Sequence, residues 1–159
     1  MSVFVSILTI AALLGAALVG GIFFAFSNFI MRALASVPSP AGLQAMQSIN
    51  IKVLNPGFLG LFMGTALIFV VLASVALLDW SAAQSPYLLG AAVAYLGGTW
   101  GVTVRGNVPL NDQLARQAPE GPDSEQIWND YVEGWTRLNS QRTGASILAA
   151  FLLHMAIWP

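Results

Sequence analysis

The first thirty residues contain one uninterrupted apolar run, and this run limits the possible folds more than any other feature of the chain. No charged side chain lies between Val3 and Met31, and the first charged residue is Arg32. An α-helix rises about 1.5 Å per residue, so the run is longer than the roughly 30 Å hydrocarbon core of a bilayer. A cleaved signal peptide is the alternative, but it would have a basic start and a shorter apolar core. We therefore predict a membrane helix over residues 3–31.

Three further stretches are candidate spans, at residues 56–78, 87–105 and 143–158. The last is the shortest, but the helical pattern before it can lengthen it. The composition agrees, because 57% of the 159 residues are hydrophobic and 8% are charged, against roughly 45–50% and about 25% in soluble proteins. The sequence predicts an all-α membrane protein: a bundle of four transmembrane helices in a single domain over residues 1–159.

The charged and metal-binding residues exclude several classes of function. Six Lys and Arg nearly balance seven Asp and Glu, so no basic face exists for nucleic acid. Cysteine is absent, and His154 is the only histidine, whereas metal sites need several ligands together. No carboxylate lies inside a predicted span, which argues against a proton-coupled transporter. We therefore expect no metal site and no nucleic-acid partner.

The basic residues predict the topology, because Lys and Arg are retained on the cytoplasmic side of a membrane. All six lie in the two connections between spans one and two and between spans three and four: Arg32, Lys52, Arg105, Arg116, Arg137 and Arg142. These connections then face inward, and both termini face outward. We expect an integral protein of a bacterial inner membrane.

Small residues spaced four apart occur in every predicted span. In lipid, helices associate through close backbone approach, so such stripes predict contact faces. The stripes are Ala17, Gly21 and Ala25; Gly60 and Gly64; Gly90, Ala94 and Gly98; and Ala145 and Ala149. Together they favour a tight bundle, and they are compatible with a homo-oligomer without requiring one.

Both inner connections are predicted to contain helices. Ser39-Pro40 is typical of a helix start, and an apolar stripe follows it, which predicts an interfacial amphipathic helix over residues 40–54. Asn55-Pro56 is a second start, for span two. Over residues 124–142 a stripe recurs at steps of three and four: Trp128, Tyr131, Trp135, Leu138 and Arg142. We expect this second amphipathic helix to continue into the fourth span.

Residues 104–114, VRGNVPLNDQL, place polar groups directly after an apolar span. Pro109 has no N–H and disfavours helical angles at the residue before it, so the third helix should end or kink near Gly106. The backbone groups freed by this break cannot face lipid and need side chains or water as partners. The amides of Asn107 and Asn111 can donate and accept, so they suit either a broken helix or a ligand oxygen.

Several of these residues form motifs that are similar to those of a known family. The motifs that carry the resemblance are Asn107-Val108-Pro109-Leu110-Asn111 and the downstream pattern of Trp135, Asn139 and Arg142. Further matching pieces are Phe23-Phe24-Ala25-Phe26-Ser27 and Asn50-Ile51-Lys52-Val53-Leu54-Asn55-Pro56. Together they resemble small bacterial and fungal membrane proteins once classed as domain of unknown function 1772 and now called anthrone-oxygenase-like. The likeness covers nearly the whole chain.

The resemblance implies a four-helix membrane protein and an expected activity. Fungal relatives oxidise anthrones to anthraquinones with molecular oxygen and without an evident cofactor. From the resemblance we expect a cofactor-independent oxygenase whose substrate is a hydrophobic polycyclic phenol that enters from the bilayer. Such a reaction requires a dry pocket that holds a flat ring and stabilises an enolate.

The candidate site residues follow from that chemistry. Arginine supplies positive charge for the enolate, asparagine amides bind ring oxygens, tryptophans stack on the ring, and Asp112 is the nearest carboxylate for a general base. The candidate catalytic residues are Asn107, Asn111, Asp112, Asn139 and Arg142. The candidate substrate-binding residues are Asn28, Asn50, Asn55, Trp100, Arg105, Tyr131 and Trp135.

Alternative interpretations remain open at this point. Arginine at the end of a membrane helix is usually an interfacial anchor, which we favour for Arg32 and Arg105. Arg142 lies on the aromatic stripe, and for it we favour a buried polar network. Besides an oxygenase, the chain can be a protein that binds a quinone, a lipid or another flat apolar ligand without chemistry. It can also be a structural bundle in which the polar cluster satisfies the interrupted third helix.

Overall fold

The fold is known from a computed structural model that describes residues 2–80 and 82–158, and every regular element in these ranges is helical. Helix α1 (Val3–Ala25) continues through a π-helical segment η1 (Phe26–Ile30) into α2 (Met31–Ala35). Helices α3 (Ser39–Lys52) and α4 (Pro56–Leu78) follow. The next long helix consists of α5 (Ser85–Val93), the π-helical segments η2 (Ala94–Gly101) and η3 (Thr103–Asn107), and α6 (Val108–Ala115). Helix α7 (Ser124–Ile157) completes the fold.

Three helices are long and apolar enough to cross a membrane: Val3–Ala35, Pro56–Leu78 and Ser85–Ala115. This finding agrees with the predicted membrane character and with the first three spans. The stretch predicted as the fourth span, residues 143–158, belongs to α7, a single helix of 34 residues whose first part is polar. Helix α7 is long enough to cross a membrane, but it is not among the helices that are also apolar enough, so the fourth span stays a prediction.

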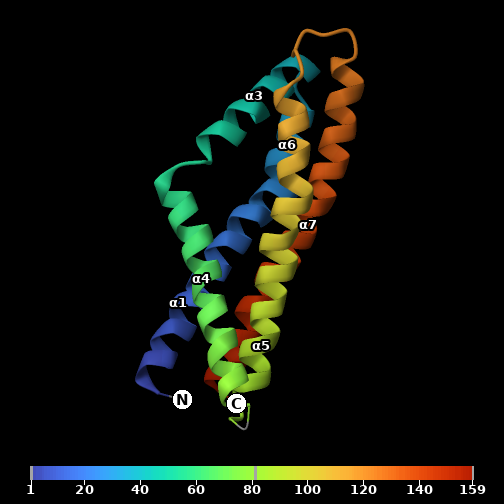
Figure 1. The fold of residues 1–159 in the computed structure, drawn as a ribbon. Helices are drawn as coiled ribbons and strands as arrows, with labels where there is room; N and C mark the ends of the chain where they lie inside the picture. Colours follow the sequence, from blue (N-terminus) through green and yellow to red (C-terminus); the bar gives the residue numbers. More distant parts are fainter. Residues whose placement is uncertain (1, 81, 159) are drawn as a thin grey trace.

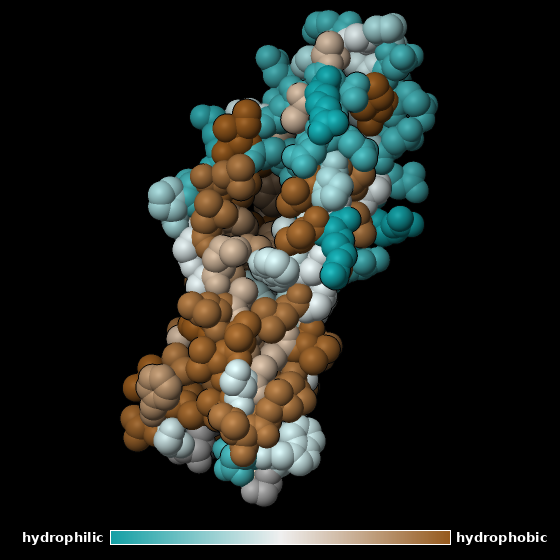
Figure 2. Space-filling view, viewed as in Figure 1, coloured by the Kyte–Doolittle hydropathy of each residue, from teal (hydrophilic) through white to brown (hydrophobic). Residues whose placement is uncertain are grey.

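The bundle has two ends of different character. Figure 1 places the starts of α1 and α5 and the ends of α4 and α7 at one end, which we call the apolar end. Helices α3 and α6 and the first half of α7 form the opposite end, which we call the polar end. In Figure 2, hydrophobic side chains cover the apolar end, whereas hydrophilic side chains gather at the polar end. The start of α1 and the end of α7 therefore lie at the same end of the molecule.

Close backbone approach holds the apolar half together at positions that the sequence stripes only partly predicted. A Cβ atom added to Gly98 would lie 2.5 Å from the Cβ of Ala145, so the third helix and α7 contact through these small residues. Gly15 similarly faces Thr65, and Gly20 faces Ser146. By contrast, the predicted contact residues Gly21, Gly60 and Gly64 have no neighbour within 4 Å of an added Cβ.

The third helix passes through Pro109 without ending, which corrects the predicted break near Gly106. Two π-helical segments precede the proline, and the N–H of Val108 bonds to the carbonyl of Thr103, five residues back. The wider π-turn relieves the clash that a proline ring makes with the preceding α-turn. The irregularity is therefore spread over residues 94–107 instead of being concentrated at one kink.

Candidate functional site

A buried arginine lies where α1, the third helix and α7 meet. The side chain of Arg142, on α7, is only 5% exposed. Its guanidinium carbon lies 4.0 Å from the ring centroid of Phe23 and 5.3 Å from that of Trp135. Both aromatic rings stabilise the cation through their negative faces. The two rings hold the guanidinium in one place.

The guanidinium has hydrogen-bond partners but no opposite charge. Nη1 donates to Thr103 Oγ1 at 3.1 Å, and Nη2 donates to Asn139 Oδ1 at 2.6 Å. Nε is buried and has no partner, and no carboxylate of the described residues bonds to this group. A buried cation is unfavourable unless it is paired, because it loses its hydration. The site is therefore electrostatically incomplete and suited to an oxygen that carries negative charge.

Asn139 fixes this arginine to the first helix. It is fully buried, and its Nδ2 donates to the carbonyl of Phe23 at 2.6 Å and to Ser27 Oγ at 2.7 Å. Because both amide hydrogens are used on this side, the carbonyl Oδ1 must face Arg142. The predicted pair Asn139 and Arg142 therefore acts as one unit.

A second group of polar side chains continues from Trp135 toward α6 and α3. Asn111 Oδ1, on α6, accepts hydrogen bonds from Trp135 Nε1 at 2.8 Å and from Tyr131 Oη at 2.9 Å. Burial raises the pKa of Tyr131 above its ordinary value, so the phenol stays protonated and donates. Asn50 Nδ2, on α3, lies 3.5 Å from the same hydroxyl. These bonds orient Asn111 so that its Nδ2, which bonds to no described residue, is free for a ligand.

Asn107 connects the third helix to α7. It is 1% exposed, and its Nδ2 donates to the carbonyl of Trp135 at 3.1 Å. Its Oδ1 is buried and has no partner in the described chain. A buried acceptor without a donor costs about 1–3 kcal/mol, so a donor from a ligand or a water molecule fits here.

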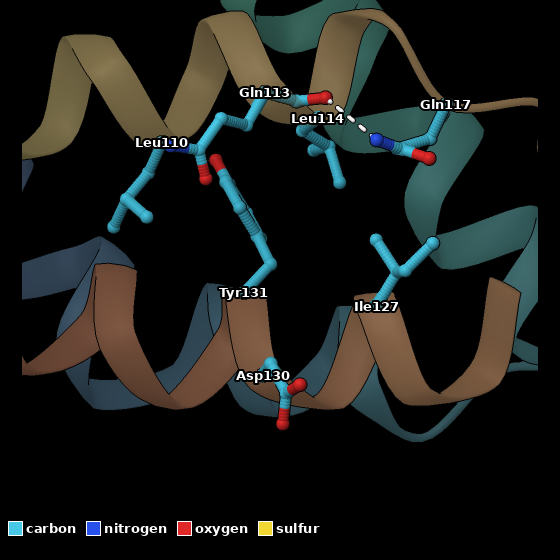
Figure 3. A pocket seen from close by; sticks show the side chains of 7 residues that line it. All are labelled: Leu110, Gln113, Leu114, Gln117, Ile127, Asp130 and Tyr131. Atoms are coloured by element: carbon cyan, nitrogen blue, oxygen red, sulfur yellow. Dashed lines mark hydrogen bonds between the residues drawn. The ribbon is translucent and has the colours of Figure 1, made fainter. Parts of the chain in front are cut away.

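Open space lies beside this cluster. Figure 2 shows that the face seen there is hollowed between α3 with the start of α4 on one side and α6 on the other. Asn50 and Asn111 come from these two flanking helices. A separate pocket of about 260 Å³ lies between α6 and α7. It is lined by Leu110, Gln113, Leu114, Gln117, Ile127, Asp130 and Tyr131. In Figure 3 the Tyr131 ring points from α7 toward α6, and Asp130 points away from the pocket.

The structure brings together seven of the twelve predicted site residues: Asn50, Asn107, Asn111, Tyr131, Trp135, Asn139 and Arg142. The other five lie apart from this network. Asn55 caps α4 by accepting from the N–H of Phe58 at 3.0 Å, and Trp100 packs against the apolar core. Arg105 and Asp112 are exposed, and Asn28 lines a different pocket, with Arg32.

Three contributing residues were not assigned a role from the sequence: Phe23, Ser27 and Thr103. Phe23 and Ser27 belong to a stretch that resembled the family, so a sequence feature pointed to the stretch but not to a role. Thr103 lies in an apolar stretch that contains other hydroxyl side chains, and no sequence feature sets it apart from them. Their function depends on contacts with α7, which only the folded chain makes.

A comparison with protein-family models identifies the group to which the chain is related. The model named anthrone oxygenase matches residues 58–152, which is more than half of the chain. The chain belongs to the anthrone oxygenase family. The matched range contains Asn107 and all the site residues of α6 and α7, whereas Phe23, Ser27 and Asn50 lie before it. Searches of the curated proteins and of the solved structures found no match.

Proposed function

We propose that this protein oxidises an electron-rich polycyclic phenol of the anthrone type with molecular oxygen, without a resident cofactor. Membership of the anthrone oxygenase family supports the reaction class. The assignment to this site rests on the buried Arg142 guanidinium. Its Nε has no hydrogen-bond partner, and the guanidinium bonds to no carboxylate of the described residues.

The proposed reaction needs only the substrate and oxygen. Loss of a proton from the methylene carbon of an anthrone gives an enolate, and this electron-rich ring reduces O2. Formation of a C–O bond and uptake of a proton give a hydroperoxide, which loses water to form the quinone. In total, one anthrone and one O2 yield one anthraquinone and one water. The protein accelerates this sequence by stabilising the enolate oxygen.

Each residue has a distinct part in this proposal. Arg142 donates to the enolate oxygen through Nε, the one guanidinium nitrogen that has no partner among the described residues. Asn111 Nδ2 donates to a further ring oxygen, and Asn107 Oδ1 accepts from a ring hydroxyl. Trp135 provides an aromatic face beside Arg142. For the proton acceptor we retain Asp112, which follows Asn111 on α6 and is exposed to solvent.

The depth of the site fits a substrate that dissolves in the bilayer. Phe23, which contacts Arg142, lies twenty residues after Val3, the first residue of α1. At about 1.5 Å per residue this corresponds to about 30 Å, the thickness of the hydrocarbon core. With α1 across the membrane, Arg142 therefore lies at the boundary between hydrocarbon and head groups. A ligand with apolar rings and a polar edge is oriented correctly at that depth.

The topology is part of the same proposal. Residues 143–158 form a fourth span, the polar end faces the cytoplasm of a bacterial cell, and both termini face outward. All six basic residues lie in the two polar-end connections, which supports this orientation. A reporter active only in the cytoplasm, fused to the C-terminus, should be inactive; an active reporter would contradict the topology.

The deciding experiment measures oxygen consumption and quinone absorbance when the purified protein in detergent receives anthrone. We expect turnover by the wild-type protein and at least a 100-fold loss in Arg142→Met, which keeps the apolar length of the side chain without its charge. Arg137→Gln, an exposed arginine on the same helix, is the matched control and should retain activity. Thermal unfolding checks that each variant is folded.

Three outcomes decide between the candidate functions. Loss of turnover in folded Arg142→Met supports the proposal. Thermal stabilisation by anthrone or anthraquinone without oxygen consumption would assign a binding protein instead of an enzyme. Turnover by Arg142→Met at the wild-type rate, or neither turnover nor binding by the wild-type protein, overturns the proposed site.

A further inference from the structure

A second pocket lies between the first helix and α7. Its volume is about 260 Å³, and it is lined by Phe24, Ser27, Asn28, Arg32, Ser140 and Thr143. Five of these six side chains can donate hydrogen bonds, one is a cation, and none is a carboxylate. This donor-rich lining differs from the pocket between α6 and α7, which includes Asp130.

Two of the donors, Arg32 and Asn28, are not used within the described chain. Neither side chain forms an ion pair or hydrogen bond there. The other donors are used internally: Thr143 Oγ1 donates to the carbonyl of Asn139 at 3.0 Å, Ser140 Oγ donates to that of Thr136 at 2.9 Å, and the hydroxyls of Ser27 and Ser140 lie 3.0 Å apart. Arg32 and Asn28 therefore suit a ligand that accepts several hydrogen bonds and carries negative charge.

The surface next to the pocket identifies the kind of ligand. Leu18, Gly21, Phe24, Asn28 and Arg32 recur at steps of three and four, so they share one face of the first helix. Leu18 and Phe24 are 60% and 51% exposed, and Gly21 has open space where a side chain would be. The same helix face is thus apolar along the span and basic at its polar end, which matches a phospholipid with its acyl chain and phosphate.

We propose that this pocket binds the phosphate of an anionic phospholipid. Arg32 and Asn28 hold the phosphate oxygens, and one acyl chain lies along the exposed face of α1. Neither Arg32 nor Asn28 belongs to the Arg142 cluster, so the proposal stands or fails independently of the oxygenase activity. Because Ser27 also accepts from Asn139, the bound lipid lies one side chain away from the residue that holds Arg142.

The test uses delipidated full-length protein in a neutral detergent, with phosphatidylglycerol, phosphatidylcholine or inorganic phosphate as the added probe. Lipid binding is measured by native mass spectrometry and by the shift in unfolding temperature. We expect phosphatidylglycerol to bind at least 10-fold more tightly than phosphatidylcholine. Arg32→Gln and Asn28→Leu should each remove most of this preference, whereas Arg116→Gln, an exposed arginine outside both pockets, should not.

Every other outcome contradicts the proposal. Equal binding of the two lipids, or an unchanged preference in Arg32→Gln, would make Arg32 an interfacial anchor only. Inorganic phosphate that stabilises the protein as well as the lipid does would assign a free-anion site. Both lining variants lie on an exposed face, so a loss of binding with an unchanged unfolding temperature of the lipid-free protein excludes misfolding as its cause.

Discussion

The apolar and polar ends of the bundle use different interactions. At the apolar end, helices approach through glycine and alanine, as at Gly98 and Ala145, and the core consists of aliphatic and aromatic side chains. At the polar end, side-chain hydrogen bonds connect α1, α3, α6 and α7 through asparagine and arginine. Two of these polar side chains retain buried atoms without partners. The comparison predicts that the apolar end supplies most of the stability, whereas the buried atoms without partners make the polar end less stable.

The substitution Asn139→Leu should have the largest effect on stability at the polar end. It leaves Nη2 of Arg142 and the carbonyl of Phe23 without their partner and should cost about 3 kcal/mol. Adding Arg142→Met removes the stranded charge, so the double variant should recover much of this loss while remaining inactive. Denaturation in detergent measures both effects. Additive losses would show that Arg142 contributes to stability and would contradict the comparison.

A clash at the apolar end should affect stability before it affects chemistry. Gly98→Ala places a methyl group 2.5 Å from the Cβ of Ala145 and should cost about 1–3 kcal/mol through overpacking. Gly97→Ala, at the adjacent position with no neighbour within 4 Å, is the matched control and should be neutral or slightly stabilising. Activity per folded molecule should stay near the wild-type value in both variants. A large loss of activity in folded Gly98→Ala would mean that the two ends are not separable.

The smallest expected effect on stability is that of Tyr131→Phe. The substitution removes one hydrogen bond to Asn111 Oδ1 and should cost about 1 kcal/mol or less. Asn111 then keeps only Trp135 as a partner and can rotate, so we expect a higher KM for the anthrone with a smaller change in kcat. Steady-state kinetics separates the two constants. An unchanged KM would show that Tyr131 does not orient Asn111 for the substrate.

Part of this fold and site could be predicted because local patterns determine it. Long apolar runs predicted the three helices that can cross a membrane, and Asn55 before Pro56 marked the start of α4. Trp128, Tyr131, Trp135 and Arg142 were placed on one helix face by their spacing, and all four are buried in α7. Spacing along one helix is enough to predict such a face, since it does not depend on the partner helix.

The remainder depends on contacts between helices. Gly21 and Gly15 are equally small, but only Gly15 meets a partner, and nothing local in the sequence distinguishes them. The contact between Phe23 and Arg142 joins the first and last helices, so neither position alone predicts it. Pro109 was expected to interrupt its helix because the π-turns that accommodate it have no signature in the apolar periodicity.

Because of the π-helical stretch before Asn107, the number of residues in the third helix matters for the site as well as their identity. Each residue of an α-helix advances about 100° around the axis, and a π-turn contains an additional residue. Deleting one residue between positions 94 and 107 can therefore be absorbed by tightening a π-turn to an α-turn, and the residues downstream would keep their angular position. A deletion that no π-turn absorbs would instead turn Asn107 and Asn111 about 100° away from the side facing Trp135, although no residue of the cluster had been changed. The additional residues of the π-turns thus make this helix tolerant of a change in length.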